Sequence, residues 1–381
     1  MENTCNQLLG YCLRGETWPP ELLDRALAED EGRAFLSIVV ERLADLFEPR
    51  LSETYTELFT QAMARVCPEL AGRVRRSGPP GQAPASTHRV YVLSRVTLGA
   101  DVAVTSVLLD AAKRRYPDAE IVFVGLRKSY ELFESDRRIK HLPAPYARTG
   151  TLLDRVRASA SLWLEDGIVI DPDSRLTQLG LISVCEEPRY FFFESRAYGG
   201  DGDERLPVLA ARWAHEVFGV ENARPYVATL PTAGEPAGIT VSFGVGENPA
   251  KRIGGDFERE LMGALAETGA SVLVDKGGSE EEWERVERAL VPGVCTHDGP
   301  FAPFAAQIAR SKLYVGYDSA GGHVASACGV PLITIFAGFV SERMFQRWRP
   351  NGTVIRGDTV NLLDEVRKSL VGQVGNLRAD W

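Results

Sequence analysis

The stretch YVGYDSAGGHVASACGVPLITIFAG, residues 314–338, contains an apolar strand, a glycine-rich turn, a helix of small residues and a second apolar strand. Strands joined through a helix are parallel, so the carboxyl end of the first strand leads into the amino end of the helix. Gly321 and Gly322 bring no side chain to this turn, and a helix start offers unpaired amides. We therefore expect a phosphate site, with Ser319 and His323 as added donors. An ordinary tight turn between a strand and a helix is the alternative.

A second glycine-rich turn occurs in VSFGVGENPAKRIGGDF, residues 241–257. Lys251 and Arg252 follow it, just before the next expected helix. Carboxyl ends of parallel strands share one edge of a sheet, so these cations are expected near the first turn, where they suit a diphosphate. Solvated residues at a helix start are the alternative. The chain has no GxxxxGK[ST] sequence, nor GxGxxG after Arg89, which argues against P-loop kinases and simple dehydrogenases.

Around these turns, short β-branched runs alternate with amphipathic helices in two successive sets, which is typical of parallel sheets covered on both faces. We predict an α/β protein with two doubly wound Rossmann-like domains, at residues 89–222 and 237–370. A proline-rich stretch, 219–238, separates the two sets as a hinge. The expected strands are 89–94, 120–126, 167–171, 189–194, 239–244, 270–275, 312–317, 331–338 and 353–356.

The N-terminal segment has a different pattern. Apolar residues recur at helical spacing over residues 1–75, and a Gly-, Pro- and Ser-rich linker follows at 76–88. We predict an all-helical extension that stands apart from the two domains. Its expected role is a docking surface for a protein partner or a dimer contact.

Composition narrows the function further. The 381 residues carry 43 basic and 52 acidic side chains, a formal charge of −9, so neither nucleic acid nor an anionic membrane is an expected partner. The six cysteines have no metal-ligand spacing, and the N-terminus lacks the basic start and apolar run of a signal peptide. We expect a cytoplasmic protein with reduced cysteines, no transmembrane segment and no bound metal.

These residues carry a family resemblance. The second domain has a strand-Gly opening with Lys251 downstream, the Gly277-Gly278 pair followed by acids, a stretch at Asp318 similar to D-[ST]-G-x-x-H, and a GVP strand. The first domain has Gly99, Asp101 and Thr105 in LSRVTLGADVAVTSVLL, residues 93–109. The chain thus resembles the ADP-heptose:lipopolysaccharide heptosyltransferases, glycosyltransferase family 9. The resemblance implies a GT-B fold, inverting transfer without a metal, and no cofactor beyond the nucleoside-diphosphate sugar donor.

The resemblance also implies roles for single residues. Asp101 is the expected general base, with a simple helix N-cap as the alternative. Acceptor-binding residues are not predicted. The expected donor-binding residues are Ser242, Gly244, Lys251, Arg252, Glu280, Asp318, Ser319, Gly321, Gly322 and His323.

The sequence departs from the family pattern at three positions. Ala100 is inserted before Asp101, Ala320 replaces a glycine, and Ser279 stands where the family often has a glutamate, which leaves Glu280 as the shifted candidate. We expect an enzyme that moves a heptose or related sugar from an ADP-sugar, or another nucleoside-diphosphate sugar, to a hydroxyl acceptor. That acceptor is either a lipopolysaccharide-core sugar or a small natural product. A catalytically silent nucleotide- or sugar-binding module, whose helical extension contacts a protein partner, is the alternative.

Overall fold

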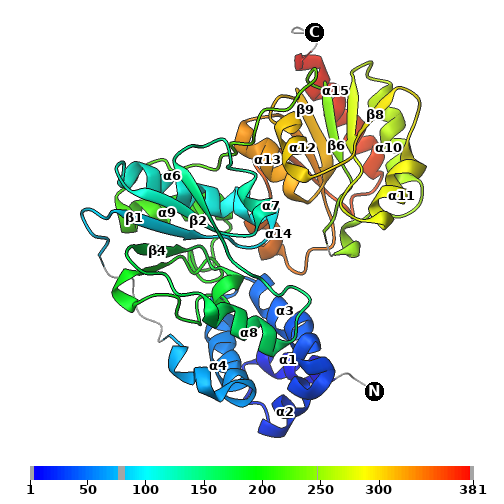
Figure 1. The fold of residues 1–381 in the computed structure, drawn as a ribbon. Helices are drawn as coiled ribbons and strands as arrows, with labels where there is room; N and C mark the ends of the chain where they lie inside the picture. The colour runs from blue at the N-terminus through cyan, green and yellow to red at the C-terminus, as the bar shows by residue number, and fades with distance from the viewer. Residues whose placement is uncertain (1–3, 76–81, 247, 378–381) are drawn as a thin grey trace. The chain divides into compact units, whose positions relative to one another are not determined.

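The computed structural model describes residues 4–75, 82–246 and 248–377, which form two compact units (Figure 1). The segments assigned to unit 1 are 1–97, 107–127 and 138–223. Those assigned to unit 2 are 98–106, 128–137 and 224–381. The short segment 98–106, which carries Asp101, therefore groups with the C-terminal part of the chain.

Unit 1 contains a parallel sheet with the strand order β3-β2-β1-β4-β5. The central strand β1 pairs with both neighbours, so that Val90 lies between Ile121 and Ile168. These β-branched side chains are buried, as expected for a parallel sheet. The strands are β1 Arg89–Leu93, β2 Glu120–Gly125, β3 Ile139–Pro143, β4 Ile168–Asp171 and β5 Tyr190–Phe192, and the main helices are α6 Ser106–Arg115, α8 Leu152–Ser161 and α9 Leu206–Phe218.

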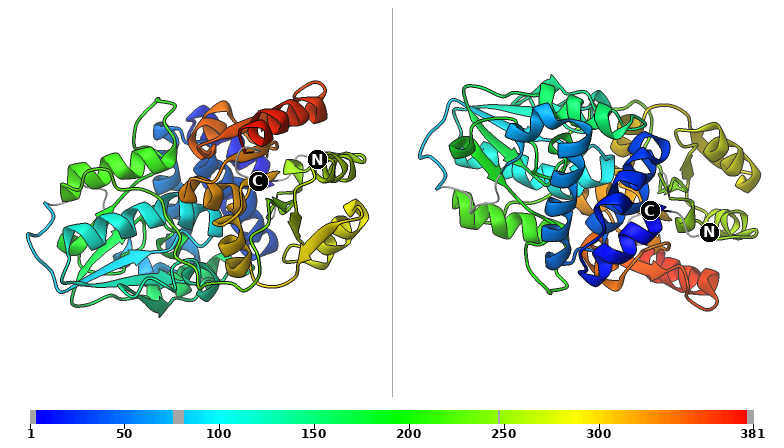
Figure 2. Two further views of the ribbon diagram at one scale, coloured as in Figure 1. Left: turned by 90° about the horizontal axis from the view of Figure 1, so that it is seen from above. Right: turned by 90° about the horizontal axis from the view of Figure 1, so that it is seen from below.

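The N-terminal helices belong to this same unit and pack together as a bundle (Figure 2). They are α1 Thr4–Arg14, α2 Pro20–Ala28, α3 Glu41–Asp45 and α4 Pro49–Val66. The Tyr55 hydroxyl of α4 donates to the Gln178 carbonyl at 2.8 Å, and Glu41 pairs with Arg175. Gln178 and Arg175 both lie in the loop that follows β4. The sequence suggested a segment that stands apart, whereas here the helices pack on the first sheet's loops beside α8 (Figure 1).

The expected linker is only partly described, because residues 76–81 lie outside the described ranges. Just before it, the Arg75 amide donates to the Leu181 carbonyl at 2.8 Å. Within it, the Pro84 carbonyl accepts from the Tyr116 hydroxyl at 3.0 Å. The described ends of this segment are thus held against unit 1.

Unit 2 contains a second parallel sheet, with the order β11-β10-β9-β6-β7-β8. Val241, Val274, Val315 and Ile335 from its strands are fully buried in one apolar cluster. The strands are β6 Ile239–Ser242, β7 Val272–Asp275, β8 Val294–His297, β9 Leu313–Tyr317, β10 Leu332–Phe336 and β11 Thr353–Arg356. The main helices are α10 Phe257–Ala266, α11 Glu280–Ala289, α12 Phe301–Ile308, α13 Ala320–Cys328, α14 Glu342–Trp348 and α15 Leu362–Leu377.

The predicted fold class is confirmed: two parallel α/β sheets follow a helical N-terminal region. Two strands were not predicted, β3 and β8, and both lie at sheet edges. Several of their residues are half-buried or exposed, so neither sequence has the apolar run that marks the central strands.

Candidate active site

The turn after β9 leads directly into α13, and the side chain at the N-cap position of this helix does not cap it. Ser319 occupies the N-cap position of α13 with extended backbone angles and makes no side-chain capping bond. Its buried Oγ has no hydrogen-bond partner among the described residues. Ala320 does not have the positive φ that would require glycine, so its methyl group is compatible with this turn. The helix start can therefore receive an anion on its amides.

Lys251 brings a positive charge to this helix start. Its Nζ lies 2.6 Å from Oδ2 and 3.2 Å from the carbonyl oxygen of Asp318. A short 3₁₀ turn, Pro249–Lys251, positions it, and the Asn248 side chain caps that turn. Both partners of the ion pair are largely buried. Lys251 thus offsets the Asp318 charge that would otherwise repel a phosphate.

His323 lies one turn into α13 and is 9% exposed. Its pKa is lowered, because burial disfavours the imidazolium and Lys251 adds to that effect, although Asp318 opposes it. The ring packs edge-on against Trp348, with centroids 5.8 Å apart. A neutral imidazole at pH 7 can donate one hydrogen bond and accept one, but it brings no charge to the site.

The two glycines around β9 and α13 make room for a tyrosine. A Cβ at Gly321 would lie 2.4 Å from the Tyr314 hydroxyl, and one at Gly316 would lie 2.6 Å from it. The hydroxyl is buried and has no hydrogen-bond partner in the described part of the chain, although Ser242 and Ser319 are its polar neighbours. Burial raises the Tyr314 pKa, so the hydroxyl keeps its proton. Sequence reasoning did not identify Tyr314 because it looks like an ordinary apolar strand residue.

Asp101 lies inside a helix of unit 2 rather than at its cap. The helix begins with α5, Leu98–Ala100, and continues through a π-helical turn, Asp101–Thr105. The N-cap alternative is therefore wrong. The Asp101 side chain is fully buried, and the Thr105 hydroxyl donates to its Oδ1 at 2.8 Å.

This helix start packs closely on α13. A Cβ at Gly99 would lie 3.0 Å from His323 Cδ2 and 3.4 Å from Ala320 Cα. Ala100, which follows Gly99, is the residue inserted relative to the family pattern. The π-turn after it contains one more residue than an α-helical turn. The insertion thus leaves Asp101 on the helix whose start contacts the candidate phosphate site.

A narrow recess lies where β6 and β7 end. Its lining residues are Phe243, Gly244, Arg252, Asp275, Lys276, Gly277, Glu282, Arg285 and Val286. Ser242 supports the first loop by accepting from the Gly244 amide at 3.3 Å. Arg252 pairs with Glu281, and its buried Nε has no partner among the described residues. Ser242, Gly244 and Arg252, all predicted donor-binding residues, therefore lie at one edge of the second sheet.

Glu282, rather than Glu280, is the acid that contacts this recess. Its Oε2 accepts from the Gly278 amide at 2.9 Å, and a Cβ at Gly277 would lie 2.7 Å from it. Glu280 is exposed at the start of α11. The α11 cap signal, Ser279 accepting from the Glu282 amide, could have identified this orientation from sequence.

Asp275 adds a second carboxyl group to the recess. Burial raises its pKa to about 6, and Glu282 adds to the shift, while His297 and the Gly277 amide oppose it. Sequence reasoning did not single out Asp275, because an aspartate at the end of a strand is common in turns. Its proton therefore responds to pH near neutrality.

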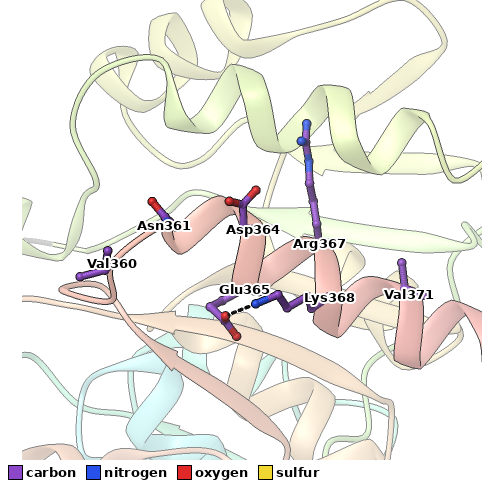
Figure 3. Close-up of a pocket in the computed structure, with 7 residues that line it drawn as sticks. All are labelled: Val360, Asn361, Asp364, Glu365, Arg367, Lys368 and Val371. Carbon is purple, nitrogen blue, oxygen red and sulfur yellow. Dashed lines mark hydrogen bonds and ion pairs between the residues drawn. The ribbon is translucent and has the colours of Figure 1, made fainter.

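A shallow recess along α15 has a different character (Figure 3). Its lining residues are Val360, Asn361, Asp364, Glu365, Arg367, Lys368 and Val371. Lys368 pairs with Glu365 at 2.7 Å, and Val360 and Val371 are largely exposed. No predicted site residue lies in this recess, so it offers a surface for control substitutions.

Among the described residues, no group of three or more His, Cys, Asp or Glu side chains could hold a metal ion.

Residues 206–374 match the model of glycosyltransferase family 9 (heptosyltransferase). The chain carries a glycosyltransferase family 9 domain. This match includes the Lys251 turn, the recess and all of α13, and it confirms the resemblance and the expectation of a glycosyltransferase. No curated protein sequence matches the chain.

Solved heptosyltransferases share the fold of this chain. The E. coli heptosyltransferase WaaC, with ADP, is 16% identical and gives a TM-score of 0.56, over 75% of this chain and 99% of WaaC. The E. coli ADP-heptose lps heptosyltransferase II is 18% identical with a TM-score of 0.54, over 76% and 99%. A family 9 glycosyl transferase from Veillonella parvula is 16% identical with a TM-score of 0.52, over 76% and 93%. The GT-B fold is thereby shown.

None of the helices in the described part of the chain is long and apolar enough to span a bilayer.

Proposed function

We propose that the protein is an inverting glycosyltransferase that moves a heptose or a related sugar from an ADP-sugar to a hydroxyl acceptor. The observation that carries this proposal is the Lys251 ammonium held at the amino end of α13. A diphosphate at that position would receive a cation, helix amides and the Ser319 hydroxyl together. Such donors stabilise the charge that develops on a departing diphosphate.

The donor would occupy the carboxyl edge of the second sheet. Its diphosphate would contact Lys251 and the turn made of Ser319, Gly321, Gly322 and His323. Its nucleoside would lie toward Ser242, Gly244 and Arg252, where Glu280 remains a predicted contact and Glu282 is an added one. Asp318 would hold Lys251 and orient the donor sugar. ADP is the proposed nucleotide because the family model describes heptosyltransferases and WaaC is described with ADP.

Asp101 is the proposed general base. Its carboxylate would take the proton of the acceptor hydroxyl, whose oxygen attacks the anomeric carbon of the donor sugar. The bond from that carbon to the diphosphate oxygen breaks on the opposite face, and the nucleoside diphosphate leaves with the bonding electrons. Attack opposite the leaving group inverts the anomeric centre. The one proton that moves in this step passes from the acceptor hydroxyl to the Asp101 carboxylate.

The acceptor is proposed to be a small natural product in preference to a lipopolysaccharide-core sugar. A lipid-linked anionic acceptor would favour a surface of free cations. Arg114 and Arg138 are engaged within the fold, since Arg114 donates to the Glu221 carbonyl and Arg138 to the Tyr116 carbonyl. Transfer only to a membrane-vesicle pool would favour the lipopolysaccharide acceptor instead.

A thermal-shift panel of ADP, GDP and UDP, each alone and as a nucleotide sugar, tests the donor assignment. A ligand at 100 times its dissociation constant stabilises the fold by about 2.7 kcal/mol. We expect a shift with ADP compounds that the Lys251→Ala variant loses. A shift with only GDP or UDP would overturn the nucleotide assignment, and no shift with any compound would overturn the donor site.

A further inference from the structure

We propose that Thr105 is a positioning residue for Asp101: its hydroxyl fixes the orientation of the Asp101 carboxylate and stabilises the ionised form. This inference rests on the proposed role of Asp101 as the general base. Thr105 would act through Asp101 and would touch neither substrate.

The contact is short and fully buried. Thr105 Oγ1 lies 2.8 Å from Asp101 Oδ1, and both side chains are 0% exposed. A carboxylate has no hydrogen to give, so the hydroxyl must be the donor when Asp101 is ionised. Water does not compete for this bond in a buried site, which makes it stronger than a surface contact.

The helix geometry directs the Thr105 hydroxyl to this carboxylate. Threonine and serine inside helices usually donate to the carbonyl three or four residues back. The neighbouring Ser106 does so, since its Oγ donates to the Val102 carbonyl at 2.5 Å. Thr105 has instead the Asp101 side chain as its partner. The amide of Ser106 reaches the Asp101 carbonyl five residues back, so the pair lies on a π-turn.

The bond has two chemical consequences. A hydrogen bond donated to a carboxylate favours its charged form and lowers its pKa, which keeps more of the base ready at a given pH. Holding one oxygen also restricts rotation of the carboxyl group, and general bases depend on such alignment. A threonine that merely filled space would affect stability but neither of these properties.

The test compares Thr105→Val, which keeps the side-chain shape, with Thr105→Ser, which keeps the hydroxyl. The matched control is Thr240→Val, because Thr240 is equally buried in unit 2 but pairs with the Ser311 hydroxyl at 3.0 Å. The probe is ADP-heptose with water as acceptor, and ADP release is followed from pH 5 to pH 9.

For Thr105→Val we expect the acid limb of the kcat profile to move up by about half to one pH unit. The plateau should fall about tenfold through lost alignment, with the KM of the donor within about twofold. Thr105→Ser should restore both properties, and Thr240→Val should leave both unchanged. A wild-type profile for Thr105→Val would overturn the inference.

The failure of the base assignment gives a different result. If Asp101→Asn keeps wild-type turnover, Asp101 is not the base and the proposed mechanism fails with it. If Asp101→Asn is inactive while Thr105→Val is unshifted, only the role of Thr105 fails. Should Thr105→Val not fold, Thr105→Ala removes the same hydroxyl without the buried branch, and the same shift is expected from it.

Discussion

Lys251 and Asp318 form a largely buried ion pair at the start of α13, with Nζ 2.6 Å from Oδ2. The pair joins two segments far apart in sequence, the 3₁₀ turn after β6 and the turn after β9. Because Nζ also contacts the Asp318 carbonyl, the ammonium is fixed before any ligand arrives. A preorganised cation at a helix start costs little reorganisation when an anion binds.

Replacing Lys251 by alanine should therefore weaken ADP binding. Hydrogen bonds to charged groups contribute about 1.5–3 kcal/mol, so we expect a loss of about 10- to 100-fold in affinity by calorimetry. The control is Lys368→Ala, whose exposed ammonium pairs with Glu365 on α15 (Figure 3). Equal ADP affinity in the wild type and the Lys251 variant would refute the assigned contact.

Gly321→Ala should disrupt the helix start. The new Cβ would lie 2.4 Å from the Tyr314 hydroxyl and 2.6 Å from its ring carbons, and Tyr314 is fully buried. Overpacking of this kind costs about 1–3 kcal/mol, so we expect a lower melting temperature and loss of the shift with ADP.

Gly263→Ala is the matched control for that substitution. Gly263 lies inside α10, and an added Cβ there would meet no atom of the described residues within 4 Å. Alanine in a helix interior is about 0.5–1 kcal/mol more favourable than glycine, so this variant should melt slightly higher. A Gly321 variant that behaves like the Gly263 variant would show that the tyrosine can move aside.

Asp275 should make the stability of the fold depend on pH. Burial raises its pKa from 3.8 to about 6, so between these values the folded chain keeps a proton that the unfolded chain has released. Stability should then fall as pH rises through this window, by up to about 3 kcal/mol. Asp275→Asn removes the titration. Its stability relative to the wild type should rise from pH 4 to pH 7 in denaturant titrations, whereas parallel curves would contradict the assignment.

The N-terminal helices should contribute to the stability of unit 1. Glu41 pairs with Arg175 in the loop after β4, and Glu41→Gln leaves the guanidinium without that charge. Since the Glu41 side chain is 35% exposed, we expect a loss of about 1–2 kcal/mol, below the value for a buried pair. Glu16→Gln, whose pair with Arg14 is half exposed, should leave the melting temperature unchanged. Equal melting of both variants would show that the extension adds no stability through this pair.

The sequence predicts the central strands well because they are buried on both faces. β1, β6, β9 and β10 lie inside their expected ranges, and the continuous apolar runs identify them. The edge strands β3 and β8 lack such runs and were not predicted. The position of the N-terminal helices depends on long-range partners, such as Tyr55 with Gln178, that no local pattern contains.

The residues of the candidate site, like the strands, could be predicted from the sequence only in part. Glycine turns and a nearby lysine are local signals, so the approach of Lys251 to the α13 turn was predictable from parallel-strand geometry. Tyr314, Asp275 and Glu282 carry no distinctive pattern, because their importance comes from burial and from glycine positions that accommodate them. The π-turn at Asp101 depends on backbone geometry that side-chain periodicity does not indicate.

The central claim is that Asp101 activates an acceptor for attack on a nucleotide sugar bound at α13. The most direct measurement is ADP release from ADP-heptose by the wild type and by Asp101→Asn, each first shown to bind ADP by calorimetry. We predict turnover by the wild type and a loss of at least about 100-fold in the variant, with ADP affinity unchanged. Equal turnover by the two proteins, or ADP binding without turnover by the wild type, would contradict the account.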